Sequence, residues 1–329
     1  MFYRRIILLA LIEAFHRPLT QTNCSMLLLL FCLKRGKNYY DFFPYNEGCY
    51  SFLVQYDKAK LTSQGILRAS DNFEIDESHP SMLMSLHYED RQILEELVKE
   101  VEPLHDEELF QKLDKQCPQL AFQKSEQVRV KIRPVNEIVL LPNPIATTKY
   151  LFTLGYEGIT IDTYINTLLT YNISTVIDVR KNPLSRKYGF SKARFASCLK
   201  QVKIDYIHLP ELGVPPALRK NLNQPDDYNA LFEFYRSSIL PKNHVVLEYL
   251  KALAIERRRT VVTCFEADYH FCHRHILVEY LQSDQHFKIP GDHLKPVSLE
   301  DNCKGEAIED FSCYSSQVEQ PLYVYTGES

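Results

Sequence analysis

The sequence predicts an α/β protein whose C-terminal half, about residues 148–295, folds as a Rossmann-like domain around a parallel sheet. Short apolar, β-branched segments bounded by turns are typical of strands that are buried on both faces. In this half of the chain such segments alternate with longer amphipathic ones, and that alternation predicts right-handed crossovers between parallel strands. Residues 1–120 lack the alternation and predict a mainly helical domain instead.

Apolar residues at helical spacing recur through the N-terminal domain. Helices are predicted over 3–15, 21–34, 52–64 and 86–115, and short strands over 66–68 and 73–75. Pro18 separates the first two helices, and Gly36 ends the second. Three helices followed by a short hairpin are the order of a winged helix, although a helical interaction or dimerisation module would show the same pattern.

Between the two domains, residues 121–147 carry several prolines and predict a stiffened linker. In the second domain strands are predicted over 150–154, 175–179, 205–209 and 260–263, and helices over 161–171, 191–202, 226–239, 243–257 and 272–283. Residues 296–329 have no periodicity, which predicts a loosely structured tail.

Composition narrows the class of protein. A net charge of −4 gives no global basic field of the kind that nucleic-acid binding produces, although a local basic patch remains compatible with it. Nine scattered cysteines without a CxxC pair predict free thiols in a reducing compartment and argue against a zinc ribbon. The apolar runs at 6–12 and 26–33 are too short to cross a bilayer, and Glu13 closes the first. We therefore expect a cytoplasmic protein without a membrane partner.

Ionisable and polar residues follow each predicted strand of the second domain. In a parallel α/β sheet, ligands bind outside the carboxyl ends of the strands, so these residues are the candidates for a site. They are Tyr156 and Glu157 after the first strand, Asp178, Arg180 and Arg186 after the second, His208 and Glu211 after the third, and Cys264, Glu266, His270, Cys272, His273 and Arg274 after the fourth.

These four segments resemble one known family. They read TLGYEG at 153–158, VIDVRKNPLSR at 176–186, IHLPELG at 207–213 and CFEADYHFCHRH at 264–275, in the order and spacing of the domain of unknown function 488 family. The resemblance covers about residues 148–295 and implies an α/β fold, but it implies no reaction. In the N-terminal domain, YDFFPYNEGCYS at 40–51 is similar to a turn in SocA-like, antitoxin-type proteins.

The arginines point to an anionic ligand. Cys272, His273 and Arg274 are predicted to open the last helix, where free N–H groups and the positive end of the helix dipole attract anions. Arg274 would clamp a phosphate or carboxylate, with Arg180 and Arg186 converging on it. The alternative is that these arginines pair internally with the carboxylates of Glu157, Asp178, Glu211 and Glu266.

The cysteines allow three interpretations. Cys264 ends a strand, as rhodanese-like thiols do, but the two carboxylates that follow would raise the thiol pKa and repel anions. Its alternative role is that of a buried, small apolar side chain. A metal site from Cys264, His270, Cys272 and His273 is conceivable, yet the Cys-x7-Cys spacing matches no common structural zinc module. The sequence accordingly predicts no metal and no cofactor.

Three functional hypotheses remain open, and with them whether the protein is an enzyme. In the first, the domain acts on a phosphate-bearing ligand, a nucleotide or nucleic acid. The catalytic candidates are Glu157, Glu266, Cys264 and Cys272, and the ligand-binding candidates are Tyr156, Asp178, Arg180, Arg186, His208, His273 and Arg274. In the second, the N-terminal domain binds DNA or a protein partner as an antitoxin-like regulator. In the third, the protein is a rhodanese-like sulfurtransferase.

Overall fold

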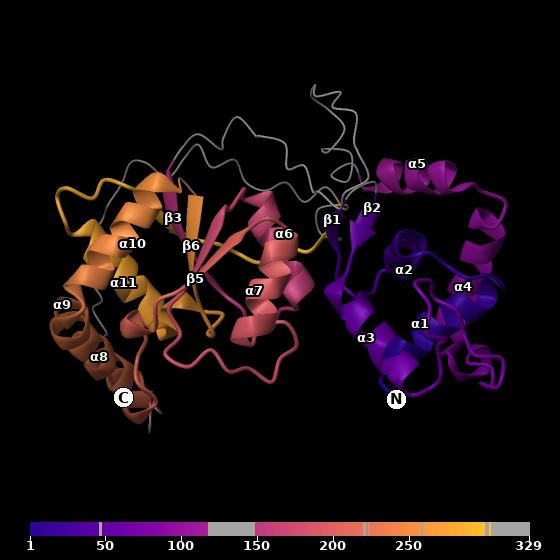
Figure 1. The fold of residues 1–329 in the computed structure, drawn as a ribbon, viewed down its shortest axis with the longest axis horizontal. Coiled ribbons are helices and arrows are strands. Elements are labelled where there is room, and N and C mark those ends of the chain that lie inside the picture. The colour runs from indigo at the N-terminus through magenta and orange to yellow at the C-terminus, as the bar shows by residue number, and fades with distance from the viewer. Residues whose placement is uncertain are drawn as a thin grey trace, which may run out of the picture.

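A computed structural model of the chain describes residues 1–45, 48–117, 149–219, 222, 224–257, 259–299 and 303. The chain forms a helical N-terminal domain and a C-terminal α/β domain that lie side by side (Figure 1). The predicted linker at 121–147 lies outside the described residues. Among the residues that are described, no helix has the length and apolarity required to span a membrane.

The N-terminal domain is built on two strongly apolar helices. Its elements are α1 (Tyr3–Ala14), α2 (Gln21–Arg35), β1 (Phe43–Tyr45), β2 (Gly48–Tyr50), α3 (Phe52–Ser63), α4 (Tyr88–Val101) and α5 (Asp106–Gln116). Helix α2 begins where the Thr20 side chain accepts a hydrogen bond from the Asn23 N–H, and it ends at Gly36 in the left-handed conformation. Buried side chains of α1 and α2 form the centre of one core with α4 and α5.

The winged-helix resemblance is not confirmed. The β1–β2 hairpin lies between the second and third helices rather than after the third. The segments predicted as strands at 66–68 and 73–75 meet only in an isolated Leu67–Ile75 bridge. The helix predicted over 86–115 is two helices, because the chain turns around Pro103 between α4 and α5.

The α/β domain contains a five-stranded, all-parallel sheet, which confirms the predicted fold class. Its order is β5-β4-β6-β3-β7. The strands are β3 (Tyr150–Gly155), β4 (Thr175–Asp178), β5 (Asp205–His208), β6 (Arg259–Cys264) and β7 (Gly291–His293). The helices are α6 (Ile161–Thr170), α7 (Lys192–Gln201), α8 (Pro225–Phe234), α9 (Leu240–Lys242), α10 (His244–Glu256) and α11 (His273–Gln282). A π-helical turn at Tyr235–Ile239 joins α8 to α9.

Successive side chains along each strand pack alternately into two separate hydrophobic cores, one on each face of the sheet. On β6, Val261 packs into the core under α6 and α7, whereas Val262 packs into the core under α8, α10 and α11. Figure 1 shows α6 and α7 on the side of the sheet that faces the N-terminal domain, and α8 to α11 on the opposite side. Polar residues at the carboxyl edge are therefore sorted by strand register to one face or the other.

A buried carboxylate joins the two domains. Asp162, in the first turn of α6, accepts hydrogen bonds from the Ser51 hydroxyl at 2.9 Å and from the backbone N–H groups of Phe52 at 2.6 Å and Leu53 at 3.1 Å. These donors form the N-terminus of α3. Burial raises the pKa of Asp162 to about 7, although the three donors act in the opposite direction. The contact thus links α3 of one domain to α6 of the other.

The C-terminal segment returns to the N-terminal domain. Leu299 is fully buried in the N-terminal core, and Cys303 forms a disulfide with Cys117 at the end of α5. The prediction that all nine cysteines are free thiols is therefore wrong for this pair, because the sequence does not reveal that segments 186 residues apart meet. Residues 296–299 are ordered by packing, and 300–302 and 304–329 lie outside the described residues.

A candidate functional site at the carboxyl edge of the sheet

Gly155 shapes the carboxyl edge where β3 and β6 end side by side. The backbone N–H groups of Tyr156 and Glu157 donate to the carbonyl of Phe265 at 3.1 Å and 2.9 Å. A Cβ at Gly155 would overlap the carbonyl oxygen of Glu266, so only glycine permits this approach. The turn after β6 is thereby held against the end of β3.

On the face covered by α6 and α7, the polar residues form a closed network. Arg180 donates to both carboxylate oxygens of Asp178, at 2.8 Å and 2.6 Å, and to the Tyr156 hydroxyl at 2.8 Å. Tyr206 donates to the same Asp178 carboxylate at 2.7 Å. Arg180 is 5% exposed and also contacts the Phe190 carbonyl. These protein partners saturate Asp178 and Arg180, as expected for a buried structural pair.

A second cluster lies on the opposite face, at the end of β6 and the start of α11. The Sγ atoms of Cys264 and Cys272 each lie 3.9 Å from His273 Nδ1. Arg219 approaches from the loop after β5: its Nη2 is 3.4 Å from His273 Nδ1 and 3.9 Å from Cys264 Sγ, and its Nη1 pairs with Glu266 at 3.0 Å. Glu266 Oε2 is 3.3 Å from Cys264 Sγ.

The two thiols are electrostatically different. The contact with Cys272 lowers the pKa of Cys264 well below its usual value, with His273 and Arg219 acting in the same direction against burial. Burial and the neighbouring Cys264 raise the pKa of Cys272. Burial also raises the pKa of the Glu266 carboxyl. The pKa values of the two neighbouring thiols are therefore shifted in opposite directions.

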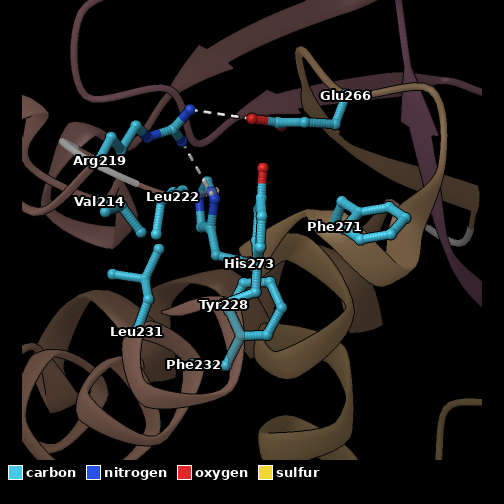
Figure 2. Close-up of a pocket in the computed structure, with 9 residues that line it drawn as sticks. All are labelled: Val214, Arg219, Leu222, Tyr228, Leu231, Phe232, Glu266, Phe271 and His273. Carbon is cyan, nitrogen blue, oxygen red and sulfur yellow. Dashed lines mark hydrogen bonds and ion pairs between the residues drawn. The ribbon is translucent and has the colours of Figure 1, made fainter. Parts of the chain in front are cut away.

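A cavity of about 260 Å³ opens beside this cluster. Its lining residues are Val214, Arg219, Leu222, Tyr228, Leu231, Phe232, Glu266, Phe271 and His273. Figure 2 shows Arg219 and Glu266 paired at one end, His273 below them, and the aromatic and aliphatic side chains around the rest. The cavity has one polar end and a mainly apolar body.

Arg274 supports the cluster from beneath. It is 2% exposed, and its guanidinium donates to the carbonyls of Glu266 at 2.6 Å and Ala267 at 2.9 Å. It also contacts the Thr153 hydroxyl at 3.3 Å. Arg274 thus fixes the turn that carries Glu266, and its donors are directed at protein carbonyls rather than at the cavity.

The other predicted residues are dispersed. Arg186 and Glu211 are exposed in the loops after β4 and β5. His208 contacts the Arg180 carbonyl at 2.9 Å on the α7 side. Glu157 accepts from the Ala267 N–H at 3.0 Å, and His270 contacts Asp268 at 2.8 Å. The structure thus brings the predicted candidates into two clusters on opposite faces, with Arg180 in one and Glu266, His273 and both cysteines in the other, and leaves the remaining candidates outside both.

Sequence reasoning missed Arg219 altogether. It lies in a short 3-10 turn, Pro216–Arg219, that follows β5 by eight residues, so it is not at a strand end. The aromatic lining residues Tyr228 and Phe232 were also missed because their spacing on α8 is that of an ordinary amphipathic helix. A basic residue in a proline-rich loop, away from any strand end, carries no signal by which the sequence would reveal its role.

The fold and site define a class: a parallel α/β domain with a small cavity and a Cys–His–Arg–Glu cluster at the carboxyl edge of its sheet. Residues 160–281 match the model of the family described as Domain of unknown function DUF488, which confirms the predicted family for this segment. The matched range includes every residue of the second cluster and stops short of the N-terminal domain. No curated protein and no solved structure matches the chain significantly.

Proposed function

We propose that the DUF488 domain of this chain is an enzyme that binds a small, nucleobase-bearing ligand in the cavity and acts on the polar edge of its ring. The observation that supports this most directly is the division of the cavity. Arg219, Glu266 and His273 converge at one end, and aromatic side chains surround the other. A few polar groups that converge in a mainly apolar pocket are typical of small-molecule sites.

The size and lining of the cavity favour a single ring system. Its volume, about 260 Å³, lies below the roughly 300–1,000 Å³ of pockets that hold drug-sized ligands. Tyr228 and Phe271 lie edge to face with ring centroids 5.3 Å apart, and Phe232 lines the same side. A flat, aromatic base matches these rings through stacking or edge contacts. Glu266 then accepts, and Arg219 donates, hydrogen bonds at the edge of that base.

A phosphate is a weaker candidate for the group that the domain recognises. Arg180 and Arg274, two of the three arginines expected to clamp it, donate to protein groups. Arg219 is already paired with Glu266, which would repel an anion. The proposed ligand is therefore a base or nucleoside, with any phosphate directed outward.

Sulfur transfer through Cys264 has less support. Cys264 is fully buried and is not among the residues that line the cavity, and the Glu266 carboxylate lies 3.3 Å from its sulfur. A nucleophilic thiol needs access to its substrate, and burial denies that access to Cys264 even though its pKa is lowered.

Calorimetric titration of the reduced protein with nucleobases, nucleosides and nucleoside monophosphates tests the proposal. We expect at least one base-bearing compound to bind, and Phe271→Ala and Glu266→Gln each to weaken that binding by about tenfold or more. Phe265→Ala and Glu279→Gln are matched controls on exposed residues outside the cavity. The proposal fails if none of these compounds binds, or if Phe265→Ala weakens binding as much as Phe271→Ala does.

A further inference from the structure

We propose that Cys264, Cys272 and His273 hold a zinc ion at the polar end of the cavity. The sulfur and nitrogen atoms that these residues offer all lie within 4.8 Å of one another, and all three side chains are buried. Among the predicted candidates for such a site, His270 is left out, because it is exposed and contacts Asp268. This inference rests on the proposed function only for the role of the ion, since metal binding itself is measured separately.

The spacing suits a tetrahedral ion. Zinc binds thiolate sulfur at about 2.3 Å and imidazole nitrogen at about 2.0 Å, which implies a sulfur–nitrogen separation of roughly 3.5 Å between two ligands. The two sulfur–Nδ1 distances of 3.9 Å need only small side-chain rotations to reach that separation. Adjustments of this size do not require the backbone of β6 or α11 to move.

The environment of His273 provides independent support. The imidazole is 2% exposed, its Nδ1 faces both thiols, and its Nε2 has no hydrogen-bond partner among the described residues. Nδ1 is the nitrogen that would bind the ion, and both thiols lie beside it, whereas Nε2, on the far side of the ring, does not bear on the metal site. Two buried thiols that pack as small apolar side chains would also not be expected to converge on an imidazole and a carboxylate.

The donor set and its position identify the metal and its role. Thiolate and imidazole ligands select zinc among the common divalent ions. Three protein ligands with one open position are typical of catalytic rather than structural zinc sites. The Glu266 carboxylate borders both Cys264 and the cavity, so the open position would face the ligand. A zinc ion there would supply a bound hydroxide at neutral pH.

The charge of Arg219 offers a second test of the metal site. Its Nη2 approaches two of the three proposed donor atoms, Cys264 Sγ and His273 Nδ1, so its positive charge competes with that of a metal ion. Removing this charge in Arg219→Gln should tighten metal binding by about tenfold. A cluster that exists only to pair a thiolate with Arg219 would show no such gain.

Cobalt titration of the full-length, untagged, reduced and metal-free protein tests the site, because thiolate-bound Co²⁺ absorbs in the near ultraviolet and tetrahedral Co²⁺ in the visible. We expect one equivalent to bind with both signatures, zinc to displace it, and Cys264→Ser, Cys272→Ser and His273→Asn each to weaken binding by about 100-fold. Cys198→Ser is the matched control, a buried free cysteine of α7 on the other face of the sheet.

The wild-type titration alone tests the metal site, even if a variant fails to fold. If the wild-type protein shows no thiolate–cobalt absorption at one equivalent of cobalt, the proposal is overturned. Equal loss of cobalt in Cys198→Ser would also overturn it. The two proposals can be tested separately. If the protein binds cobalt but no base, only the proposed function is contradicted. If it binds a base but no cobalt, only the proposed zinc site is contradicted.

Discussion

Arg274 illustrates how a residue with the chemistry of a ligand clamp acts inside the fold. Its three donors fix the carbonyls of Glu266 and Ala267 and the Thr153 hydroxyl, so it sets the position of the turn that carries Glu266. Arg219, by contrast, is partly exposed at the cavity, and its guanidinium lies beside Glu266, His273 and Cys264. Arg274 therefore acts inside the fold, whereas Arg219 lines the cavity in which we propose that a ligand binds.

Replacing Arg274 with glutamine should destabilise the protein by about 2–4 kcal/mol, because it leaves buried carbonyls without donors. Urea denaturation of wild type and variant measures the loss. Arg236→Gln, which removes an exposed ion pair between the turn at Tyr235–Ile239 and Glu279 of α11, should change the unfolding free energy by less than about 1 kcal/mol. Equal stability of Arg274→Gln and wild type would show that Arg274 does not support the turn.

Gly155→Ala should damage the site while leaving most of the sheet intact. The added methyl group would overlap the Glu266 carbonyl, so the turn after β6 must shift. We expect base binding to weaken by at least about tenfold, with a loss of roughly 1–3 kcal/mol in unfolding free energy. Gly65→Ala is the comparison for binding: it strains a left-handed glycine (φ 72°) far from the site, so it should cost about 1 kcal/mol of stability and leave base binding unchanged. Unchanged base binding in Gly155→Ala would contradict the role given to this close approach.

Single residues were only partly predictable from sequence. Cys264, Glu266, Cys272 and His273 stand out because they follow a strongly apolar strand, and the carboxyl edge of the sheet brings them together. Arg180 was grouped with them, but its position two residues after Asp178 places it on the opposite face. A shift of one residue along a strand changes the face, and sequence alone does not resolve the strand end to that precision.

At the scale of elements, the spacing of apolar residues determined which strands could be predicted from the sequence. Strands β3, β4 and β6 are rich in apolar and β-branched residues and are buried on both faces, and their predicted bounds differ from the observed ones by at most one residue. Strand β7 was missed because Gly291–His293 is short and contains no apolar residue. The β1–β2 hairpin was missed because Pro44 and Gly48, within two strands of three residues each, are typical of turns.

The junction of α6 with α3 should make stability depend on pH. The folded state holds a proton on Asp162 up to about pH 7, whereas the unfolded chain releases it near pH 4. The folded state therefore binds more protons between these values, and its unfolding free energy should fall as pH rises from about 4 to about 7, by at most roughly 4 kcal/mol. Asp162→Asn should remove this slope.

The comparison uses urea denaturation of both proteins at intervals across that range. The difference between the wild-type and Asp162→Asn unfolding free energies isolates the carboxyl group from other titrating residues. Parallel pH profiles for the two proteins would show that the three donors at the start of α3 hold Asp162 ionised at all these pH values.

At the scale of the whole molecule, the C-terminal segment ties the domains together. It leaves the α/β domain after β7 and places Leu299 in the N-terminal core, with Cys303 bonded to Cys117. The sequence predicted a loose tail here, because a few buried residues produce no periodicity. Contacts between distant segments are the part of the fold that local pattern cannot reveal.

Leu299→Ala should therefore lower the unfolding free energy by about 2–4 kcal/mol, as expected when a fully buried leucine is truncated. Leu184→Ala provides the control, since Leu184 is 87% exposed and should contribute less than about 0.5 kcal/mol. Denaturant unfolding of both variants measures the effect. Equal stabilities would mean that the segment does not pack on the N-terminal domain in solution.

The carboxyl edge of the sheet carries two polar clusters on opposite faces, and we propose that the cluster around Arg180 is structural and the cluster around Arg219 functional. The most direct test measures the unfolding free energy and base binding of Arg180→Gln and Arg219→Gln side by side. Arg180→Gln should cost about 3–5 kcal/mol because it leaves the buried Asp178 carboxylate unpaired. Arg219→Gln should stay within about 1 kcal/mol of wild type and weaken base binding at least tenfold. A large loss of stability in Arg219→Gln, with base binding unchanged, would contradict the account.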